Sequence, residues 1–154
     1  MTIRKGEAWG ETAPLPDDGV VVSSDLEARQ VLTAARLEKR PLPVLGLLGG
    51  DLCRTLGGRG DATRLRSDAA VTFPVDLGEV LLDGRLHLFV AHVVARRRAR
   101  TGSHLPHPAI ELRRTRAAQF EFARPIPVRL DGETVGRFRS LSVRVEPDAV
   151  RVVV

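Results

Sequence analysis

Two carboxylates flank a glycine in PVRLDGETVG, residues 127–136. Residues i and i+2 of a tight turn can converge on one exposed point, and turns held by a rigid sheet often carry function. If Asp131 took the proton of a hydroxyl group while Glu133 oriented it or raised its basicity, the pair would suit phosphoryl transfer to an alcohol. The alternative is an ordinary turn. LLDGRLHL, residues 81–88, has the same Asp-Gly turn but carries Arg85 in place of Glu133.

A second stretch has the residue types of a phosphate site. Gly49 and Gly50 follow the apolar run PVLGLL, residues 43–48, and precede Asp51 at the start of a short helical pattern. Free backbone N–H groups and the positive end of a helix dipole favour a phosphate at such a turn. A steric role for the two glycines is the alternative. The P-loop and dinucleotide-binding fingerprints are missing from the sequence.

The remaining residues of reactive type do not form a set. Cys53 is the single cysteine, and we expect a small core residue and not a nucleophile. His104 and His107 lack a third and fourth ligand, so we expect a polar loop and predict no metal site. The arginine run at residues 95–100 is expected to be a solvated charge run, and Trp9 is expected to pack against the protein.

Local patterns predict the elements that would position these residues. Val20–Val22 is a short β-branched run and predicts a buried strand. A Ser-x-x-Glu capping box at Ser24 and Glu27 predicts a helix start, in which Ser24 accepts from the N–H of Glu27 and Glu27 reaches back to the N–H of Ser24. Apolar residues at near-helical spacing continue this helix, and Pro41 ends it.

A second strand and helix follow. Residues 43–48 predict a buried strand, and residues 51–56 predict a short helix with Asp51 as N-cap and Gly57-Gly58 at its end. The order strand, helix, strand, helix is typical of a parallel α/β layer.

From Val71 onward the pattern changes to antiparallel strands. Asp83-Gly84 lies between two apolar runs and predicts a two-residue hairpin. Four short strands are expected at AAQFEFA, PIPVRL, SLSVRV and AVRVVV, residues 117–123, 125–130, 140–145 and 149–154. The predicted fold class is a degenerate, doubly wound α/β part at residues 1–70 joined to an antiparallel β-sandwich at residues 71–154.

Charge is distributed unevenly along the chain, whose formal net charge is +5. Residues 1–95 carry 11 basic and 13 acidic side chains, whereas residues 96–154 carry 13 basic and 6 acidic ones. The basic part indicates an anionic partner, such as phosphate esters, an acidic membrane surface or nucleic acid. A GC-rich genome is an equal explanation for 22 Arg against 2 Lys. Nucleic acid is the weakest candidate, because five Phe, one Trp and no Tyr leave few side chains for base stacking.

The sequence lacks the patterns of membrane and secreted proteins. No apolar run approaches the ~20 residues that cross a bilayer. The polar start, MTIRKGEAWGE, has no apolar signal core. We therefore expect a cytoplasmic protein without a transmembrane segment.

The C-terminal part of the chain resembles the end of bacterial lipid kinases of the diacylglycerol and sphingosine kinase type. In that family a strand leads to apolar-x-Asp-Gly-Glu, similar to LDGE at residues 130–133. A final pair of strands there ends in a phrase like VEPDALRVLV, similar to VEPDAVRVVV at residues 145–154. The similarity runs from His107 to Val154.

The first half resembles a shortened version of the same family. A Gly-Gly-Asp-Gly-Thr motif in family members corresponds to Ser23, Ser24 and Asp25, with serines in place of the two glycines. The family's Gly-Thr-Gly-Asn-Asp segment is similar to GLLGGDLCRTLGG, residues 46–58, in shortened form. The family's metal-binding phrase Asp-Gly-x-Leu-Asp, expected near residues 98–101, has no counterpart.

The resemblance implies transfer of the γ-phosphoryl group of ATP to a lipid hydroxyl, such as that of diacylglycerol, with Mg²⁺ bridging the phosphates. Asp131 would be the general base and Glu133 its supporting carboxylate. The residues implied at the nucleotide phosphates are Ser23, Ser24, Asp25, Gly49, Gly50 and Asp51.

The departures from the family imply that this activity is impaired or lost. A serine Cβ hinders the close approach of backbone to a triphosphate, and one missing donor can cost ~10²–10³ in rate. The alternative is a non-catalytic module, a pseudokinase, that binds anionic lipid or another protein. The implied partner is a lipid substrate or an anionic membrane surface, which would place a cytoplasmic protein at the periphery of the membrane. A homodimer is left open.

Overall fold

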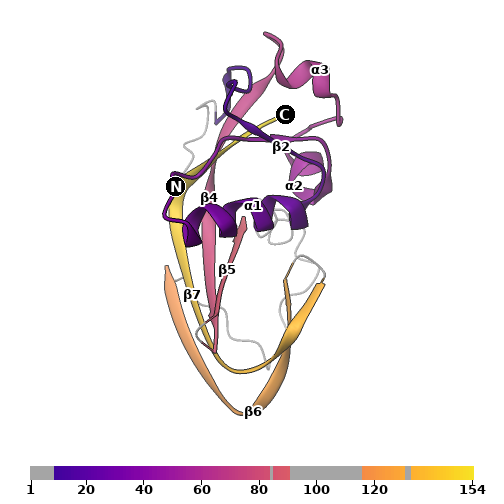
Figure 1. Ribbon diagram of the computed structural model, residues 1–154. Coiled ribbons are helices and arrows are strands. Elements are labelled where there is room, and N and C mark those ends of the chain that lie inside the picture. The colour runs from indigo at the N-terminus through magenta and orange to yellow at the C-terminus, as the bar shows by residue number, and fades with distance from the viewer. Residues whose placement is uncertain (1–8, 84, 91–115, 131–132) are drawn as a thin grey trace.

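The computed structural model describes residues 9–83, 85–90, 116–130 and 133–154 (Figure 1). In these ranges, helices accompany one seven-stranded sheet. The helices are α1 (Asp25–Leu37), α2 (Gly50–Thr55) and α3 (Ala62–Leu65). The strands are β1 (Glu11–Thr12), β2 (Val20–Val22), β3 (Leu45–Leu47), β4 (Val71–Leu82), β5 (Arg85–Val90), β6 (Ala117–Leu130) and β7 (Glu133–Val153).

The sheet combines parallel and antiparallel pairs. Its strand order is β1-β4-β7-β3-β2, with β5 paired to β4 and β6 paired to β7. β2 and β3 run parallel with Val20 opposite Leu45, and β3 runs parallel to the end of β7 with Leu45 opposite Val152. The other pairs are antiparallel. The final strand therefore joins strands from both halves of the chain in one sheet.

The largest buried cluster joins α1 and α2 to the strands of the sheet. Its fully buried members include Leu32 of α1, Leu45 of β3 and Val75 of β4, each with no exposed surface. Cys53 of α2 belongs to the same cluster. Removal of this apolar surface from water is the main favourable term that holds the helices on the sheet.

α1 begins at the predicted capping box. Oγ of Ser24 accepts a hydrogen bond from the N–H of Glu27 at 3.1 Å. The return bond differs from the prediction, because Oε2 of Glu27 accepts from the N–H of Ser23 at 2.6 Å and not from that of Ser24. The Glu27 side chain thus accepts from the backbone N–H of Ser23, the residue before the N-cap. Ala28 and Leu32 are on the buried face of the helix.

Ion pairs attach the C-terminal half of α1 to the sheet. Nη2 of Arg36 lies 2.7 Å from Oε2 of Glu146, and its Nε lies 3.6 Å from Oε1 of Glu79. Nε of Arg144 also donates to Glu79, at 3.0 Å. α1 ends at Leu37, before the proline that was predicted to stop it.

α2 begins differently from the prediction. Its N-cap is Gly49, which has no side-chain acceptor, so the prediction of Asp51 as N-cap was wrong. The carboxylate of Asp25, at the start of α1, accepts from the first N–H groups of α2 instead. The helix ends before Gly57, whose left-handed φ of 84° matches the predicted glycine stop.

The hairpin predicted around residue 83 is confirmed. β4 and β5 pair antiparallel with Leu82 opposite Arg85, while Gly84 lies outside the described residues. Asp83 anchors this turn to a third strand, because its Oδ1 accepts from the N–H of Ser140 at 2.9 Å and from its hydroxyl at 3.1 Å.

The four short strands predicted in the C-terminal part are two long strands, β6 and β7. The expected interruption near residue 124 is a register shift between Glu121 and Ile126 of β6. The one expected at residues 146–148 is a shift in the pairing of β7 with β4, between Val75 and Leu77, which lie opposite Val150 and Glu146. Bulges of this kind bend a strand without ending its pairing. Figure 1 shows both strands curving so that the start of β7 rises toward α1.

The mixed α/β content and the strand-rich sheet agree with the coarse fold class expected from the sequence. All described strands belong to one sheet. The doubly wound part, the sandwich and the boundary after residue 70 stay predictions. In the described ranges, no helix is both long enough and apolar enough to cross a membrane.

Candidate functional site

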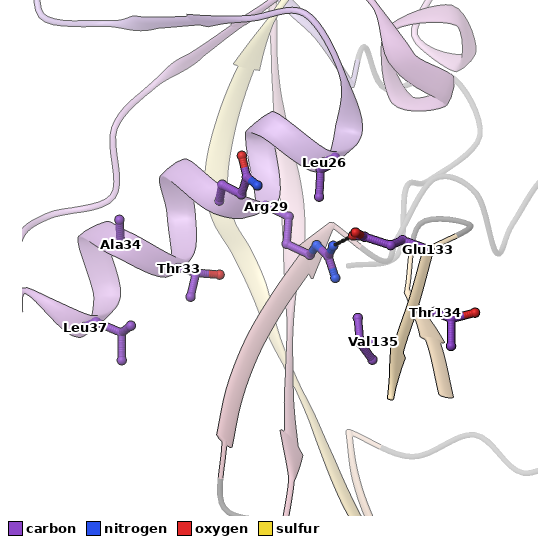
Figure 2. Close-up of a pocket in the computed structure, with 9 residues that line it drawn as sticks. Leu26, Arg29, Thr33, Ala34, Leu37, Glu133, Thr134 and Val135 are labelled. Carbon is purple, nitrogen blue, oxygen red and sulfur yellow. Dashed lines mark hydrogen bonds and ion pairs between the residues drawn. The ribbon is translucent and has the colours of Figure 1, made fainter. Parts of the chain in front are cut away.

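A groove of ≈ 530 Å³ lies between one face of α1 and the first residues of β7 (Figure 2). The α1 side chains that line it share a helix face because they recur at intervals of three and four residues. The lining residues are Leu26, Arg29, Gln30, Thr33, Ala34 and Leu37 from α1, and Glu133, Thr134 and Val135 from β7.

An ion pair joins the two walls of the groove. Nη2 of Arg29 donates a hydrogen bond of 2.7 Å to Oε2 of Glu133. The Arg29 side chain is 8% exposed, whereas that of Glu133 is 55% exposed. Arg29 follows the buried Ala28 and lies one turn before the buried Leu32, so α1 fixes its position. Glu133, by contrast, is the first residue of β7 and faces solvent.

The walls of the groove are amphipathic. The apolar lining side chains are Leu26, Ala34, Leu37 and Val135. Leu37 is 65% exposed and Leu26 is 36% exposed, so both retain apolar surface that contacts water. Exposed apolar side chains beside a buried charge suit a ligand that is part hydrocarbon and part polar.

Only one of the two predicted catalytic carboxylates can be placed. Glu133 lines the groove, whereas Asp131 lies outside the described residues, and its role as general base stays a prediction. Sequence reasoning missed Arg29. The sequence could have indicated Arg29 as a charged residue beside Ala28, on the buried face of a helix. Nothing in the sequence indicates that it pairs with a carboxylate 104 residues away.

The two predicted phosphate turns lie side by side. Parallel pairing of β2 and β3 brings residues 23–25 next to residues 49–51, at the carboxyl ends of both strands. Oδ2 of Asp25 accepts from the N–H of Asp51 at 2.8 Å, and Oδ1 accepts from the N–H of Leu52 at 3.3 Å. The Asp25 carboxylate therefore occupies the N-terminal end of α2.

The two glycines allow this close approach. A Cβ at Gly50, whose φ is +94°, would collide with Oδ1 of Asp25, and a Cβ at Gly49 would collide with the carbonyl oxygen of Ser23. Ser24 is occupied as the N-cap of α1. These contacts give a steric reason for both glycines, which is the alternative to a phosphate-binding role.

The phosphates of ATP do not fit these turns unless Asp25 moves. The N–H groups that would hold a phosphate already donate to Asp25, and Asp51 places a second carboxylate nearby, paired with Arg54. Within the described residues, no group of three or more His, Cys, Asp or Glu side chains could hold a metal ion. ATP and Mg²⁺ stay predictions.

Cys53 is a core residue, as predicted. It is 2% exposed, and its Sγ–H donates to the carbonyl of Leu47 at 3.4 Å. Burial raises the pKa of the Cys53 thiol above its ordinary value, so the thiolate is disfavoured. These properties are those of an inert structural cysteine.

Trp9 also packs as expected. Its ring lies 5.0 Å from that of Phe73, and its Nε1–H donates to the carbonyl of Pro74 at 3.0 Å. The other residues singled out from the sequence, His104, His107 and the arginine run at 95–100, lie outside the described residues.

The groove and the two turns are the candidate sites. The resemblance to lipid kinases rests on the sequence motifs and stays a prediction. No protein-family model, no curated protein and no solved structure matches the chain.

Proposed function

We propose that this protein is a lipid-kinase-like protein that binds a neutral lipid alcohol of the diacylglycerol type in the groove between α1 and β7, with phosphoryl transfer impaired or lost. The observation that carries the proposal is the position of Glu133 among apolar side chains. The resemblance makes Glu133 the supporting carboxylate of Asp131, the implied general base for the lipid hydroxyl. The proposal includes the family architecture, a doubly wound part joined to a sandwich, and a location at the periphery of a membrane.

The groove has the chemistry that a lipid alcohol needs. Glu133 uses Oε2 for Arg29, and its 55% exposure leaves the carboxylate accessible to a hydroxyl donor. Leu26 and Leu37 offer exposed apolar surface for the start of an acyl chain. A volume of ≈ 530 Å³ is within the range of roughly 300–1,000 Å³ that small-molecule sites occupy.

The contacts of Asp25 support impaired phosphoryl transfer. Asp25 and Arg29 are four residues apart on α1, so the implied nucleotide turn and the groove are one helical turn apart. That proximity is what a kinase requires. However, the Asp25 carboxylate at the start of α2 would repel a phosphate there and already holds the N–H donors.

Binding of dioctanoylglycerol to the full chain tests the lipid proposal. Leu37→Asp places a charge on the apolar wall and is expected to weaken binding by about tenfold or more, since buried apolar area is lost and a charge is desolvated. Leu81→Asp is the matched control, because Leu81 is 42% exposed on β4 and is not among the lining residues. Equal affinities for the two variants, or no binding to the wild type, would overturn the proposal.

Turnover of ATP with dioctanoylglycerol tests the second part. We expect no turnover above the background rate. Turnover that disappears in Asp131→Asn would contradict impaired activity, while it would support the lipid-kinase assignment itself.

A second candidate function, a non-catalytic module on anionic membranes, is favoured by exposed arginines. They include Arg124, Arg129, Arg137 and Arg139 on β6 and β7. Under this alternative, co-sedimentation with vesicles containing phosphatidylserine falls as salt rises, and Leu37→Asp leaves it unchanged. Sedimentation that is independent of salt would remove this alternative.

A further inference from the structure

The ion pair in the groove combines a fixed cation with an anion that is free to turn into water. The Arg29 side chain is 8% exposed and stands on α1 beside the buried Ala28, so its charge is largely buried at the wall of the groove. Glu133 is 55% exposed. Water can solvate its carboxylate when it separates from Arg29, and another carboxylate that takes its place keeps the buried guanidinium charge paired.

We propose that Arg29 makes the groove a site for a long-chain carboxylate, a fatty acid anion, which replaces the Glu133 carboxylate at the guanidinium. This inference rests on the proposed function in one respect, namely that an acyl chain lies in the same groove. The exchange forms and breaks no covalent bond. One carboxylate leaves Arg29 for water, and another arrives with its hydrocarbon chain along α1.

The present partner of Arg29 establishes the chemistry of the head group. A carboxylate oxygen already sits 2.7 Å from Nη2, so the site accommodates this group in hydrogen-bonding geometry. A guanidinium binds planar carboxylates well and retains its charge at all physiological pH values. The interaction energy with Arg29 should therefore change little when one carboxylate replaces another.

The apolar walls of the groove should make a fatty acid bind more tightly than a small carboxylate. Leu37 lines the groove about two helical turns after Arg29, and Ala34 lines it between them. A chain that leaves Arg29 in this direction covers the exposed surface of Leu37, and its burial favours binding in proportion to the apolar area removed from water. Acetate lacks this contribution.

Glu133 acts in this view as an internal competitor. As long as it occupies Arg29, the apparent affinity for an outside carboxylate is reduced by the fraction of molecules in which Arg29 is available. Removal of its charge should raise that affinity. The neutral lipid alcohol of the proposed function does not need Arg29 and uses the Glu133 carboxylate as a hydroxyl acceptor, so this change should not tighten its binding.

The experiment compares laurate, monolaurin and acetate, each below its aggregation concentration, by calorimetric titration of the full chain. The variants are Glu133→Gln and Arg29→Gln. Their matched controls are Glu38→Gln and Arg40→Gln, because Glu38 and Arg40 form an exposed ion pair of 2.6 Å at the C-terminal end of α1 and are not among the lining residues. We expect Glu133→Gln to tighten laurate binding at least about tenfold and not to tighten monolaurin binding, because the proposed function uses the Glu133 carboxylate as the acceptor for the lipid hydroxyl. Arg29→Gln should abolish the preference for laurate over monolaurin.

Unchanged laurate affinity in Glu133→Gln would overturn the inference, as would equal effects in the control pair, which would indicate general charge attraction. Acetate that binds as tightly as laurate would also overturn it. If Arg29→Gln does not fold, Glu133→Gln against Glu38→Gln still decides the outcome, since both replace exposed side chains. Monolaurin binding without a laurate response would remove this inference and leave the proposed function intact. Laurate binding without monolaurin binding would remove the proposed function and leave this inference intact.

Discussion

Arg29 on α1 and Glu133 at the start of β7 form an ion pair of 2.7 Å between segments that are 104 residues apart in the chain. The pair connects the end of the β6–β7 hairpin to the N-terminal half of α1. Both residues also line the groove between α1 and β7. The two partners differ greatly in exposure, at 8% and 55%, and this difference determines how each responds to mutation.

Removal of Glu133 should destabilise the protein more than removal of Arg29. Glu133→Ala takes the carboxylate from a buried guanidinium and should lower the free energy of unfolding by about 1–2 kcal/mol. Arg29→Met leaves a carboxylate that water can solvate and keeps the apolar stem, so we expect a change within about 1 kcal/mol. Urea denaturation measures both. The reverse order would mean that packing of the Arg29 stem outweighs the ion pair.

Asp25 should contribute to stability through α2. Asp25→Ala removes the acceptor for the N–H groups of Asp51 and Leu52, and we expect a loss of about 1–2 kcal/mol, as for other helix caps. Asp51→Ala is the control, since its exposed pair with Arg54 should contribute at most about 0.5 kcal/mol. Denaturant midpoints for both variants give the comparison. Equal losses would show that Asp25 does not act as the cap.

Cys53 should be unreactive in the folded protein. Burial raises the pKa of its thiol above 9.0, so a thiol reagent at pH 8 should react at least about 100-fold faster after denaturation. The unfolded thiol ionises at lower pH than the folded one. The contribution of the protonated Cys53 thiol to the free energy of unfolding is therefore fully present below pH 9.0, and it is lost as pH rises through the pKa of the folded state. Cys53→Ala should abolish this alkaline dependence, and rapid labelling of the native protein would contradict the prediction.

Asp83 should show the opposite pH behaviour. The hydrogen bond from the N–H of Ser140 lowers the pKa of the Asp83 carboxyl below 3.8. Its contribution to stability is present above pH 3.8 and is lost as pH falls through the folded pKa. A carboxyl-carbon NMR titration should give a midpoint below 3.8, and Ser140→Pro, which removes the N–H, should raise it. A midpoint at 3.8 or above in the wild type would contradict the prediction.

Local features of the fold could be predicted from the sequence. The strand at Val20–Val22, the N-cap at Ser24, the hairpin at Asp83 and the glycine stop at Gly57 were predicted and are confirmed. Each depends on a few neighbouring residues whose conformational preferences and hydrogen bonds agree. The predicted N-cap of α2 was wrong because the acceptor at this helix end is not a neighbouring residue. It is Asp25, which precedes Asp51 by 26 residues. The predicted burial of the Val20–Val22 strand was also wrong at Val21, which is 38% exposed.

The sequence by itself predicted β2, β3, α1, α2 and the β4–β5 hairpin, and it singled out the carboxylate of Glu133, whereas β1 and α3 were not predicted. Only the tertiary structure decided that Glu133 meets Arg29, that Asp25 takes the end of α2, and that β7 joins both halves of the chain in one sheet. The physical reason is that these contacts depend on the bend of β6 and β7 and on the register of parallel strands. Both are set by burial across the whole core, and no spacing along the chain encodes them.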